Sequence, residues 1–213
     1  MKIDWRTVGA FQENSYLLVD SSTQRAVLVD PGAEPEQLIA MVRASRATLD
    51  AIWLTHAHID HIGAIAAVKR SWNVPVYLHP ADRPLFDRGA MQAAAYGLPF
   101  EEPPKPDYEL AEGDVLTVGS IPFDVLHVPG HAPGHVVFVG DGHMIGGDLL
   151  FAGSIGRTDL PLSDPERMTE SLERVTGLPD ETVVHPGHGP ATSIGRERAT
   201  NPFLTGVARV VRR

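Results

Sequence analysis

Four residues that could bind metal ions lie close together in the first third of the sequence. His56, His58, Asp60 and His61 fall within six positions, directly after the apolar stretch 51–55. Imidazole and carboxylate groups are the donors that zinc, iron and manganese take from proteins. Residues two apart in an extended chain face the same side, so His56, His58 and Asp60 can converge on one point. If a helix begins near Asp60, His61 can serve a neighbouring point, as a pair of ions about 3.5–4 Å apart requires.

Each of these residues also has an ordinary structural use. An aspartate before a helix is a common N-cap, which is the competing interpretation of Asp60. A single histidine at the end of a strand is more often a hydrogen-bonded residue than a ligand. Three imidazoles and a carboxylate at this spacing are harder to explain in that way, because burying such groups without partners costs free energy. The cluster therefore predicts a metal centre.

Three further candidate ligands follow later apolar stretches, each next to a glycine. His131 follows 123–128, Asp148 follows 144–147, and His188 stands between two glycines after 182–184. Glycine lets the backbone turn tightly and come close to a ligand. Each residue alone is weak evidence, because an aspartate can cap a turn and a histidine can lie in an exposed loop. With the first cluster they complete a set of seven nitrogen and oxygen donors.

The other histidines receive different predictions. We expect a structural role for His79, which precedes a helix start. His127 alternates along a strand face and His143 lies in a hairpin turn, so we expect neither to be a ligand. His135 and His185 lie close to proposed ligands in the sequence, so we expect them to support those ligands from behind.

The elements that position these residues alternate between strands and helices. Apolar stretches rich in β-formers predict strands at 15–19, 26–29, 51–55, 74–78, 114–118, 123–128, 136–139, 144–146 and 182–184. Helical spacing predicts helices at 35–46, 60–72, 164–177 and 193–201, and one or two more within 82–96. The interleaving predicts an α/β protein, with a sheet core and helices on its outer faces.

Length and composition narrow the class of protein further. The 213 residues fit a single domain, and the formal net charge of −9 disfavours broad contact with nucleic acids or anionic membranes. There are no cysteines, so thiol nucleophiles, iron–sulfur clusters and cysteine-bound zinc are excluded. Neither a secretory signal nor an apolar stretch of membrane-spanning length is visible. We therefore expect a cytoplasmic protein that acts on a small molecule; the sequence does not indicate an oligomeric state.

Taken in order, the motifs resemble those of the metallo-β-lactamase-fold superfamily. The matching segments are Thr55–His61, Pro129–His131, Gly147–Asp148 and Gly187–Gly189, and the resemblance covers nearly the whole chain. It implies one domain over 1–213, an α/β (α+β) four-layer αββα sandwich with metal ions at one edge between two sheets. It also implies the two ion sites: His56, His58 and His131 for the first, Asp60, His61 and His188 for the second, and Asp148 bridging both.

Within the superfamily, the closing stretch 187–203 resembles the short, single-domain members of the glyoxalase II group, the hydroxyacylglutathione hydrolases. That resemblance implies thioester hydrolysis by a hydroxide that bridges two divalent ions, with Asp60 orienting it. Zinc is the expected metal, and iron or manganese are alternatives. Two departures leave glutathione recognition open. The sequence ends at Arg213, before the helical domain of larger members, and 156–159 replaces their basic and aromatic stretch. Arg157 could meet a substrate carboxylate or form an ordinary ion pair.

Several other activities use the same fold and stay open. A persulfide dioxygenase would hold a single iron at His56, His131 and Asp148, and the segment 156–159 resembles that group too. A lactone hydrolase would use the same ligand set. A binding module without activity is a further alternative, which the intact ligand positions disfavour. A serine hydrolase is disfavoured, because no Gly-x-Ser-x-Gly segment is present.

Overall fold

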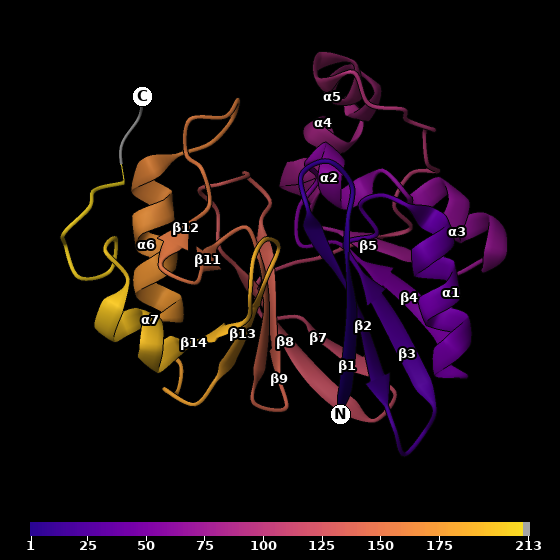
Figure 1. Ribbon diagram of the computed structural model, residues 1–213, viewed down its shortest axis with the longest axis horizontal. Coiled ribbons are helices and arrows are strands. Elements are labelled where there is room, and N and C mark those ends of the chain that lie inside the picture. The colour runs from indigo at the N-terminus through magenta and orange to yellow at the C-terminus, as the bar shows by residue number, and fades with distance from the viewer. Residues whose placement is uncertain (211–213) are drawn as a thin grey trace.

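The computed structural model describes residues 1–210, and its centre consists of two six-stranded β-sheets stacked face to face (Figure 1). The first sheet has the order β1-β2-β3-β4-β5-β6, and the second has the order β14-β13-β10-β9-β8-β7. The strands of the first sheet are β1 (Lys2–Val8), β2 (Glu13–Asp20), β3 (Arg25–Val29), β4 (Thr48–Trp53), β5 (Val76–Leu78) and β6 (Tyr108–Glu109). Those of the second are β7 (Val115–Val118), β8 (Ile121–His127), β9 (Val136–Gly140), β10 (His143–Gly147), β13 (Val183–Pro186) and β14 (Thr192–Ser193). A small ribbon pairs β11 (Leu150–Phe151) with β12 (Ser154–Ile155).

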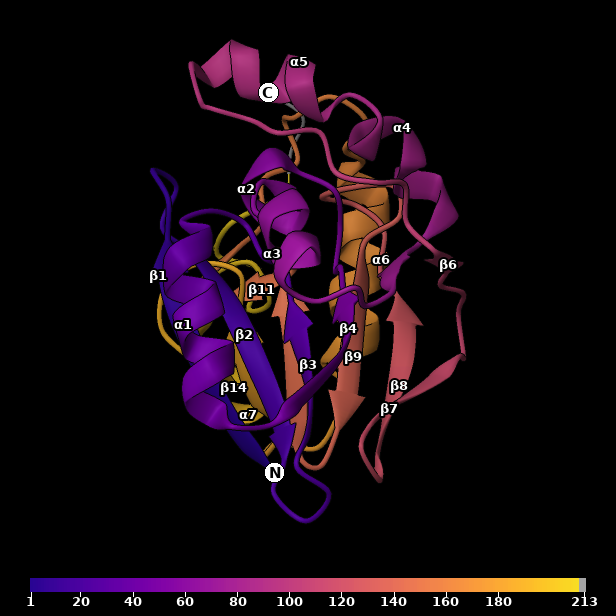
Figure 2. The same cartoon turned by 90° about the vertical axis from the view of Figure 1, so that its right-hand side faces the viewer.

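Helices cover the outer face of each sheet. On the first sheet lie α1 (Pro35–Ser45) and α3 (Ile65–Ser71), and on the second lie α6 (Pro165–Val175) and α7 (Ile194–Thr200) (Figures 1 and 2). The short elements α2 (Ile59–Ile62), η1 (Pro80–Asp82), α4 (Arg83–Phe86) and α5 (Gly89–Tyr96) cluster at one end of the molecule. The predicted α/β class and the four-layer αββα sandwich are confirmed. None of the described helices is long and apolar enough to cross a membrane.

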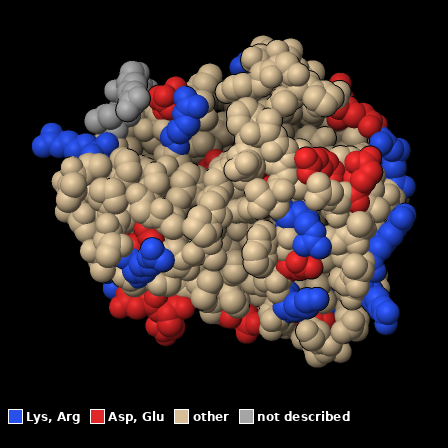
Figure 3. Space-filling model, viewed as in Figure 1, with Lys and Arg blue, Asp and Glu red and all other residues tan. Residues whose placement is uncertain are grey.

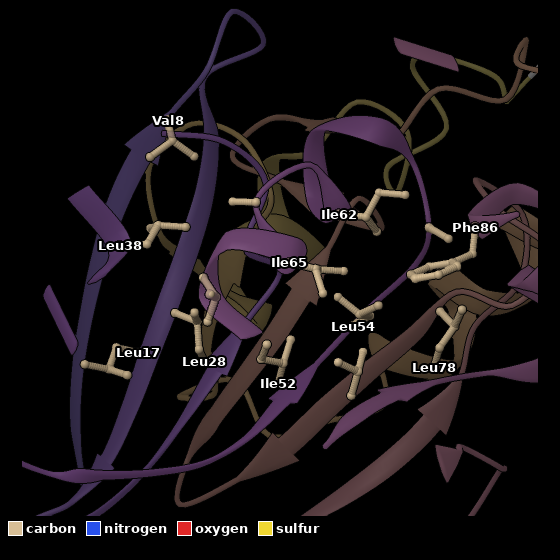
Figure 4. Packing of buried hydrophobic residues seen from close by; sticks show 14 of the residues in the cluster. Val8, Leu17, Leu28, Leu38, Ile52, Leu54, Ile62, Ile65, Leu78 and Phe86 are labelled. Carbon is tan, nitrogen blue, oxygen red and sulfur yellow. The ribbon is translucent and has the colours of Figure 1, made fainter. Parts of the chain in front are cut away.

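Alternation along the strands divides the buried side chains among the layers. In β2, Leu17 and Val19 face the helices α1 and α3, whereas Tyr16 and Leu18 face the second sheet. Figure 4 shows the cluster between the first sheet and its helices. Between the sheets, Trp53 packs against aromatic rings of the second sheet, with its centroid 5.0 Å from that of Phe138. Both faces of the central strands of the first sheet are therefore buried, which fixes the register of these strands.

Strand direction explains why the predicted ligands meet. The pairs β3·β4 and β10·β13 are parallel, and β8 and β10 are both antiparallel to β9. The carboxyl ends of β3 and β4 therefore share one edge, and those of β8, β10 and β13 share another. The backbone N–H of Asn14, in β2, donates to the carbonyl of Gly187 at 2.7 Å, which joins the two edges. The loops after five strands thus open at the same end of the sandwich.

The helix expected at 60–72 is interrupted. It forms two helices, α2 and α3, with Gly63 following the first. A Cβ at position 63 would overlap with the carbonyl oxygen of Gly32, so the glycine allows the turn after β3 to lie directly against α2. This break gives the residues of α2 an orientation of their own. Asp60 lies inside α2, whose N-cap is His58, so Asp60 does not serve as the N-cap.

The helix predicted at 164–177 is confirmed in its start and nearly in its end. Pro165 opens α6, and the side chain of Asp164 accepts hydrogen bonds from the backbone N–H groups of Glu166 and Arg167. These bonds satisfy two donors that have no partner within the helix. The first strand, β1, was not among the predicted elements.

Candidate metal centre

The first group of predicted ligands comes from two loops on opposite sheets. His56 and His58 follow β4, and His131 follows β8. One ring nitrogen from each of the three lies within 4.8 Å of the others. The closest two are Nδ1 of His58 and Nε2 of His131, at 2.8 Å. Three imidazole nitrogens that converge in this way can hold one divalent ion.

The second group lies beside the first. Asp60 and His61 come from α2, and His188 comes from the loop after β13. Oδ2 of Asp60 is 3.3 Å from Nε2 of His188 and 3.9 Å from Nε2 of His61. Two imidazoles and a carboxylate form a second set of the kind that binds zinc, iron or manganese.

Asp148 stands between the two groups. Its Oδ2 is 3.4 Å from Nε2 of His131, in the first group, and 3.4 Å from Nε2 of His188, in the second. Its Oδ1 is 3.5 Å from Nε2 of His61. The structure thus brings all seven predicted residues to one place, with Asp148 where a bridging carboxylate would lie. The role of each individual residue stays a prediction.

Atoms without partners show that this cluster suits metal ions. Nε2 of His56, Nε2 of His61 and Oδ1 of Asp148 are buried and have no hydrogen-bond partner among the described residues. Leaving polar atoms unsatisfied in the interior costs about 1–3 kcal/mol each. Divalent ions would satisfy all three, because they accept electron pairs from just such nitrogen and oxygen atoms. His and Asp side chains of this kind form a metal-binding cluster.

The second nitrogen of four rings is held from outside. Nδ1 of His61 lies 2.9 Å from Oδ2 of Asp30, and Nδ1 of His56 lies 3.0 Å from Oγ1 of Thr55. Backbone carbonyls do the same for the other two rings: that of Arg157 is 2.8 Å from Nδ1 of His131, and that of Phe11 is 3.0 Å from Nδ1 of His188. Such outer hydrogen bonds fix the ring orientation and leave Nε2 for the ion.

The pKa values of the histidines differ between the two groups of ligands. Burial lowers the pKa of His56 well below its usual range and that of His58 to about 3. Both rings are therefore neutral, and each can donate an electron pair to a metal ion. Burial also acts to lower the pKa of His188, but the hydrogen bonds that its Nε2 donates to Asp148 and Asp60 outweigh burial and raise that pKa to about 10. The two carboxylates thus stabilise a proton on Nε2 of His188, and a divalent ion would displace this proton on binding.

Asp148 carries the charge that both groups share. Burial by itself would raise the pKa of its carboxyl group, but the neighbouring imidazoles, His61 first, hold that pKa well below its ordinary value. Burial likewise acts to lower the pKa of His61, and the carboxylates of Asp60, Asp148 and Asp30 raise it instead. The carboxylates of the centre therefore stabilise positive charge in the buried place where metal cations are expected.

Sequence reasoning missed two buried acids next to the centre. Asp30, which directly follows the predicted strand 26–29, accepts hydrogen bonds from the backbone N–H and the hydroxyl of Thr55, at 2.7 and 2.6 Å. One oxygen of Asp30 also groups with ring nitrogens of His56 and His61 within 4.8 Å. Glu13, at the start of β2, is fully buried 3.9 Å from His61, and burial raises its pKa. The detectable signal was that Asp30 also follows a buried strand.

A third buried acid ties the two ligand loops together. Asp82 accepts hydrogen bonds from the backbone N–H groups of Ala57, between two ligands of the first loop, and of Gly134, in the loop of His131. Burial raises the pKa of Asp82 to about 6. Its contribution is geometric, because it fixes the distance between loops that belong to different sheets.

The remaining histidines divide as follows. Nε2 of His135 accepts a hydrogen bond from the backbone N–H of Asp148, so His135 does support a ligand. His185 instead lies against His143, with 3.0 Å between ring nitrogens, and no described contact joins it to the centre. His143 opens β10 rather than a hairpin turn, and His79 and His127 stack on one another with centroids 4.1 Å apart.

The side chain of Arg157 forms the ion pair that the sequence left open. Its Nε and Nη2 donate to the two oxygens of Asp159, at 2.8 and 3.1 Å, and 64% of the side chain remains exposed. Arg157 also lines a cavity of about 590 Å³ that includes Gly156, Phe203 and Arg209. Its backbone carbonyl contacts His131, whereas its side chain points to Asp159 and contacts none of the predicted ligands among the described interactions.

Known proteins share both the sequence pattern and the fold. The pattern of the metallo-β-lactamase superfamily matches residues 8–188. Hydroxyacylglutathione hydrolase GloC of Haemophilus influenzae is 37% identical over 96% of this chain and 98% of its own. TTHA1623, solved in a di-iron-bound form, is 48% identical, with a TM-score of 0.88 over 94% of this chain and all of its own. The B3 metallo-β-lactamase BLEG-1 is 40% identical, with a TM-score of 0.89 over 96% of this chain and all of its own.

The solved di-iron form of a relative agrees with the donor set found here, which can hold two divalent ions. The match extends across all the segments that supply the ligands. The chain belongs to the metallo-β-lactamase superfamily of metal-dependent hydrolases.

Proposed function

We propose that this protein is a glyoxalase II-like thioesterase that hydrolyses a hydroxyacylglutathione or a related small-molecule thioester. The observation that supports it most directly is the convergence of His and Asp side chains around buried atoms that lack hydrogen-bond partners. The 37% identity to a protein named hydroxyacylglutathione hydrolase supports the substrate class. We expect zinc at both positions, with iron or manganese as alternatives, because the donors are nitrogen and oxygen.

Divalent ions held by this set would supply Lewis acidity, which makes water nucleophilic near neutral pH and polarises a substrate carbonyl. The side chains supply position. The carboxylate of Asp60 is 18% exposed and lies 3.3 Å from Nε2 of His188, so it can accept a hydrogen bond from the attacking water and orient it. A thiolate leaves readily, so the site needs no strong general acid.

Arg157 is our candidate for binding a carboxylate on the thiol part of the substrate. It is exposed, lies beside the centre and would exchange its contact with Asp159 for one with the substrate. Guanidinium groups bind carboxylates through two parallel hydrogen bonds. Arg157→Ala should therefore raise KM for a carboxylated thioester and leave kcat nearly unchanged, since the contact is the same in the ground state and the transition state.

Metal analysis combined with turnover of S-lactoylglutathione tests the proposal. Protein purified without added metal should hydrolyse this thioester, lose the activity on chelation and regain it with zinc, iron or manganese. His131→Gln should remove the activity, whereas His143→Gln is the matched control, because His143 pairs with His185 away from the centre. Turnover that survives complete removal of metal would refute the proposal.

The same measurements separate the other activities. A persulfide dioxygenase with one iron at His56, His131 and Asp148 would consume oxygen with glutathione persulfide, and the proposed thioesterase would not. Lactones, and the β-lactams suggested by the likeness to BLEG-1, belong in the same substrate panel. A metal-loaded protein that is inert toward every substrate would instead favour a binding role.

A further inference from the structure

A second cavity, of about 570 Å³, opens beside the centre on the side of Asp60. The tip of the β1–β2 hairpin, the start of α1, the segment α2–α3 and the loop after α5 enclose it. Its lining is mainly apolar and includes Val8, Phe11, Ala33, Ile59, Leu98 and Phe100. A concave apolar site of this volume is typical of small-molecule binding.

The cavity borders the second group at Asp60. Asp60 lines it, and the carboxylate of Asp60 is 3.3 Å from Nε2 of His188. Phe11 lines it too, while its backbone carbonyl holds Nδ1 of His188. The ring of Phe11 also rests edge-on against Tyr96, with centroids 5.0 Å apart. One part of a substrate could thus occupy the cavity while the carbonyl group of the same substrate lies at the centre.

The two cavities that flank the centre differ in charge. Glu34, Glu36 and Glu101 line the apolar cavity with a single cation, Arg70, which is paired to Glu101. The cavity on the other side contains two cations, Arg157 and Arg209, and one acid, Asp159, which is paired to Arg157. Figure 3 shows that acidic and basic side chains are interspersed on the visible face and form no broad basic patch. An anionic group would be repelled from the first cavity and attracted to the second.

We propose that the apolar cavity binds the acyl group of the thioester, and that this acyl group is uncharged and apolar. The inference rests on the proposed function and narrows its substrate from hydroxyacyl thioesters to related thioesters with an aliphatic acyl group. The anionic thiol part would then extend toward Arg157 and Arg209 on the opposite side. A lactoyl group is small and polar and would leave most of the cavity unfilled, so longer aliphatic acyl groups are the better substrates.

Chain length and a filled cavity test the proposal. With metal-loaded protein, kcat/KM for the acetyl, butanoyl and hexanoyl thioesters of glutathione should rise about fourfold per added methylene, because burial of each methylene in the cavity stabilises the transition state by that factor. Ala67 lines the cavity, so Ala67→Phe should fill it and remove most of this gradient. Ala40→Phe is the matched control, because Ala40 is exposed on α1 and does not line the cavity.

A binding measurement keeps this test independent of turnover. S-hexylglutathione, a thioether that cannot be hydrolysed, should bind the metal-loaded protein by calorimetry at least about tenfold more tightly than S-methylglutathione. Ala67→Phe should abolish that difference, and Ala40→Phe should keep it. Failure to hydrolyse any thioester would refute the proposed function, whereas equal affinity for the two thioethers would refute the acyl cavity.

The charge of the lining gives a second variant that does not depend on filling the cavity. The wild type should prefer the hexanoyl thioester to the adipoyl thioester, which carries a terminal carboxylate. Glu36→Lys should reduce this preference at least about threefold, since it replaces a repelling charge with an attracting one. A flat chain-length series together with an unchanged preference in Glu36→Lys would overturn the proposal.

Discussion

Gly187→Ala is the smallest change that should disturb the centre without removing a ligand. Gly187 precedes His188 and lies directly behind two other ligands. A Cβ at this position would lie 2.9 Å from Cε1 of His61 and closer still to Oδ1 of Asp148, whereas ordinary contact begins at 3.4 Å. The backbone of Gly187 is not in the left-handed region, so alanine can adopt its conformation. The effect of the substitution is therefore steric overlap of the added methyl group and not backbone strain.

The size of the effect follows from the overlap. Asp148 must move by about 1 Å, or the loop of His188 must withdraw by as much, and a displacement of that size can lower a rate about 100-fold. Disturbing the surroundings of metal ligands typically weakens metal binding by 10–100-fold. The added methyl group in a packed site should also lower the free energy of unfolding by about 1–3 kcal/mol.

Competition with a chromophoric chelator would measure metal affinity, and S-lactoylglutathione hydrolysis would measure kcat. Gly146→Ala is the matched control. It lies near the end of the neighbouring strand β10, but a Cβ there would meet its nearest atoms, on Met144 and Val184, only at 3.5 Å. We therefore expect Gly146→Ala to bind metal as the wild type does and Gly187→Ala to bind it at least about tenfold more weakly.

A Gly187→Ala variant with the metal affinity and kcat of the wild type would refute this steric role of Gly187. Equal losses of affinity in Gly146→Ala and Gly187→Ala would refute it as well, because they would reflect general destabilisation of the strand ends. Urea unfolding of both metal-free variants checks that each is folded.

Three further predictions concern residues outside the ligand set. Asp82→Ala should lower the free energy of unfolding by about 2 kcal/mol or more, measured in urea, because it leaves the buried N–H groups of Ala57 and Gly134 without acceptors. Asp164→Ala should cost about 1 kcal/mol through loss of the α6 cap and should leave metal content unchanged. Burial lowers the pKa of His185 to about 4 from an ordinary value of 6.5, so between these pH values only the unfolded chain takes up this proton and stability falls as the pH falls. In metal-free protein, His185→Gln should reduce that fall by up to about 3 kcal/mol between pH 6.5 and 4; an unchanged pH profile of the urea midpoint would contradict this assignment.

The ligand cluster was predictable because its signals are local. Each candidate follows an apolar stretch, and the carboxyl ends of parallel strands in one sheet share an edge. The cap of α6 was equally visible, since Asp164 and Pro165 form a start signal within two residues. In both cases a few consecutive residues determine where the strand ends or the helix begins.

Other features depend on contacts between distant segments. Glu13 reaches the centre only because β2 pairs with β3 and its start meets the loop of His188. Asp30 was visible as a strand end, but its hydrogen bonds to Thr55 arise from the pairing of β3 with β4. The break at Gly63 likewise follows from the close approach of Gly32, which no helical pattern contains.

The edge strand β1 was missed for a different reason. It contains Lys2, Asp4 and Arg6, which are typical of an exposed N-terminal segment rather than of a buried strand. Backbone pairing with β2 along its whole length outweighs those charges. Charged residues also suit an edge, because they discourage pairing with other chains.

The central claim is that two divalent ions occupy this cluster, and the number of ions per chain tests it most directly. Elemental analysis of protein purified without chelators should find two divalent ions per chain, and Asp148→Ala should lower that number, because Asp148 lies between both ligand groups. A folded wild-type protein that retains no divalent ion, even after dialysis against zinc, iron and manganese, would contradict the account.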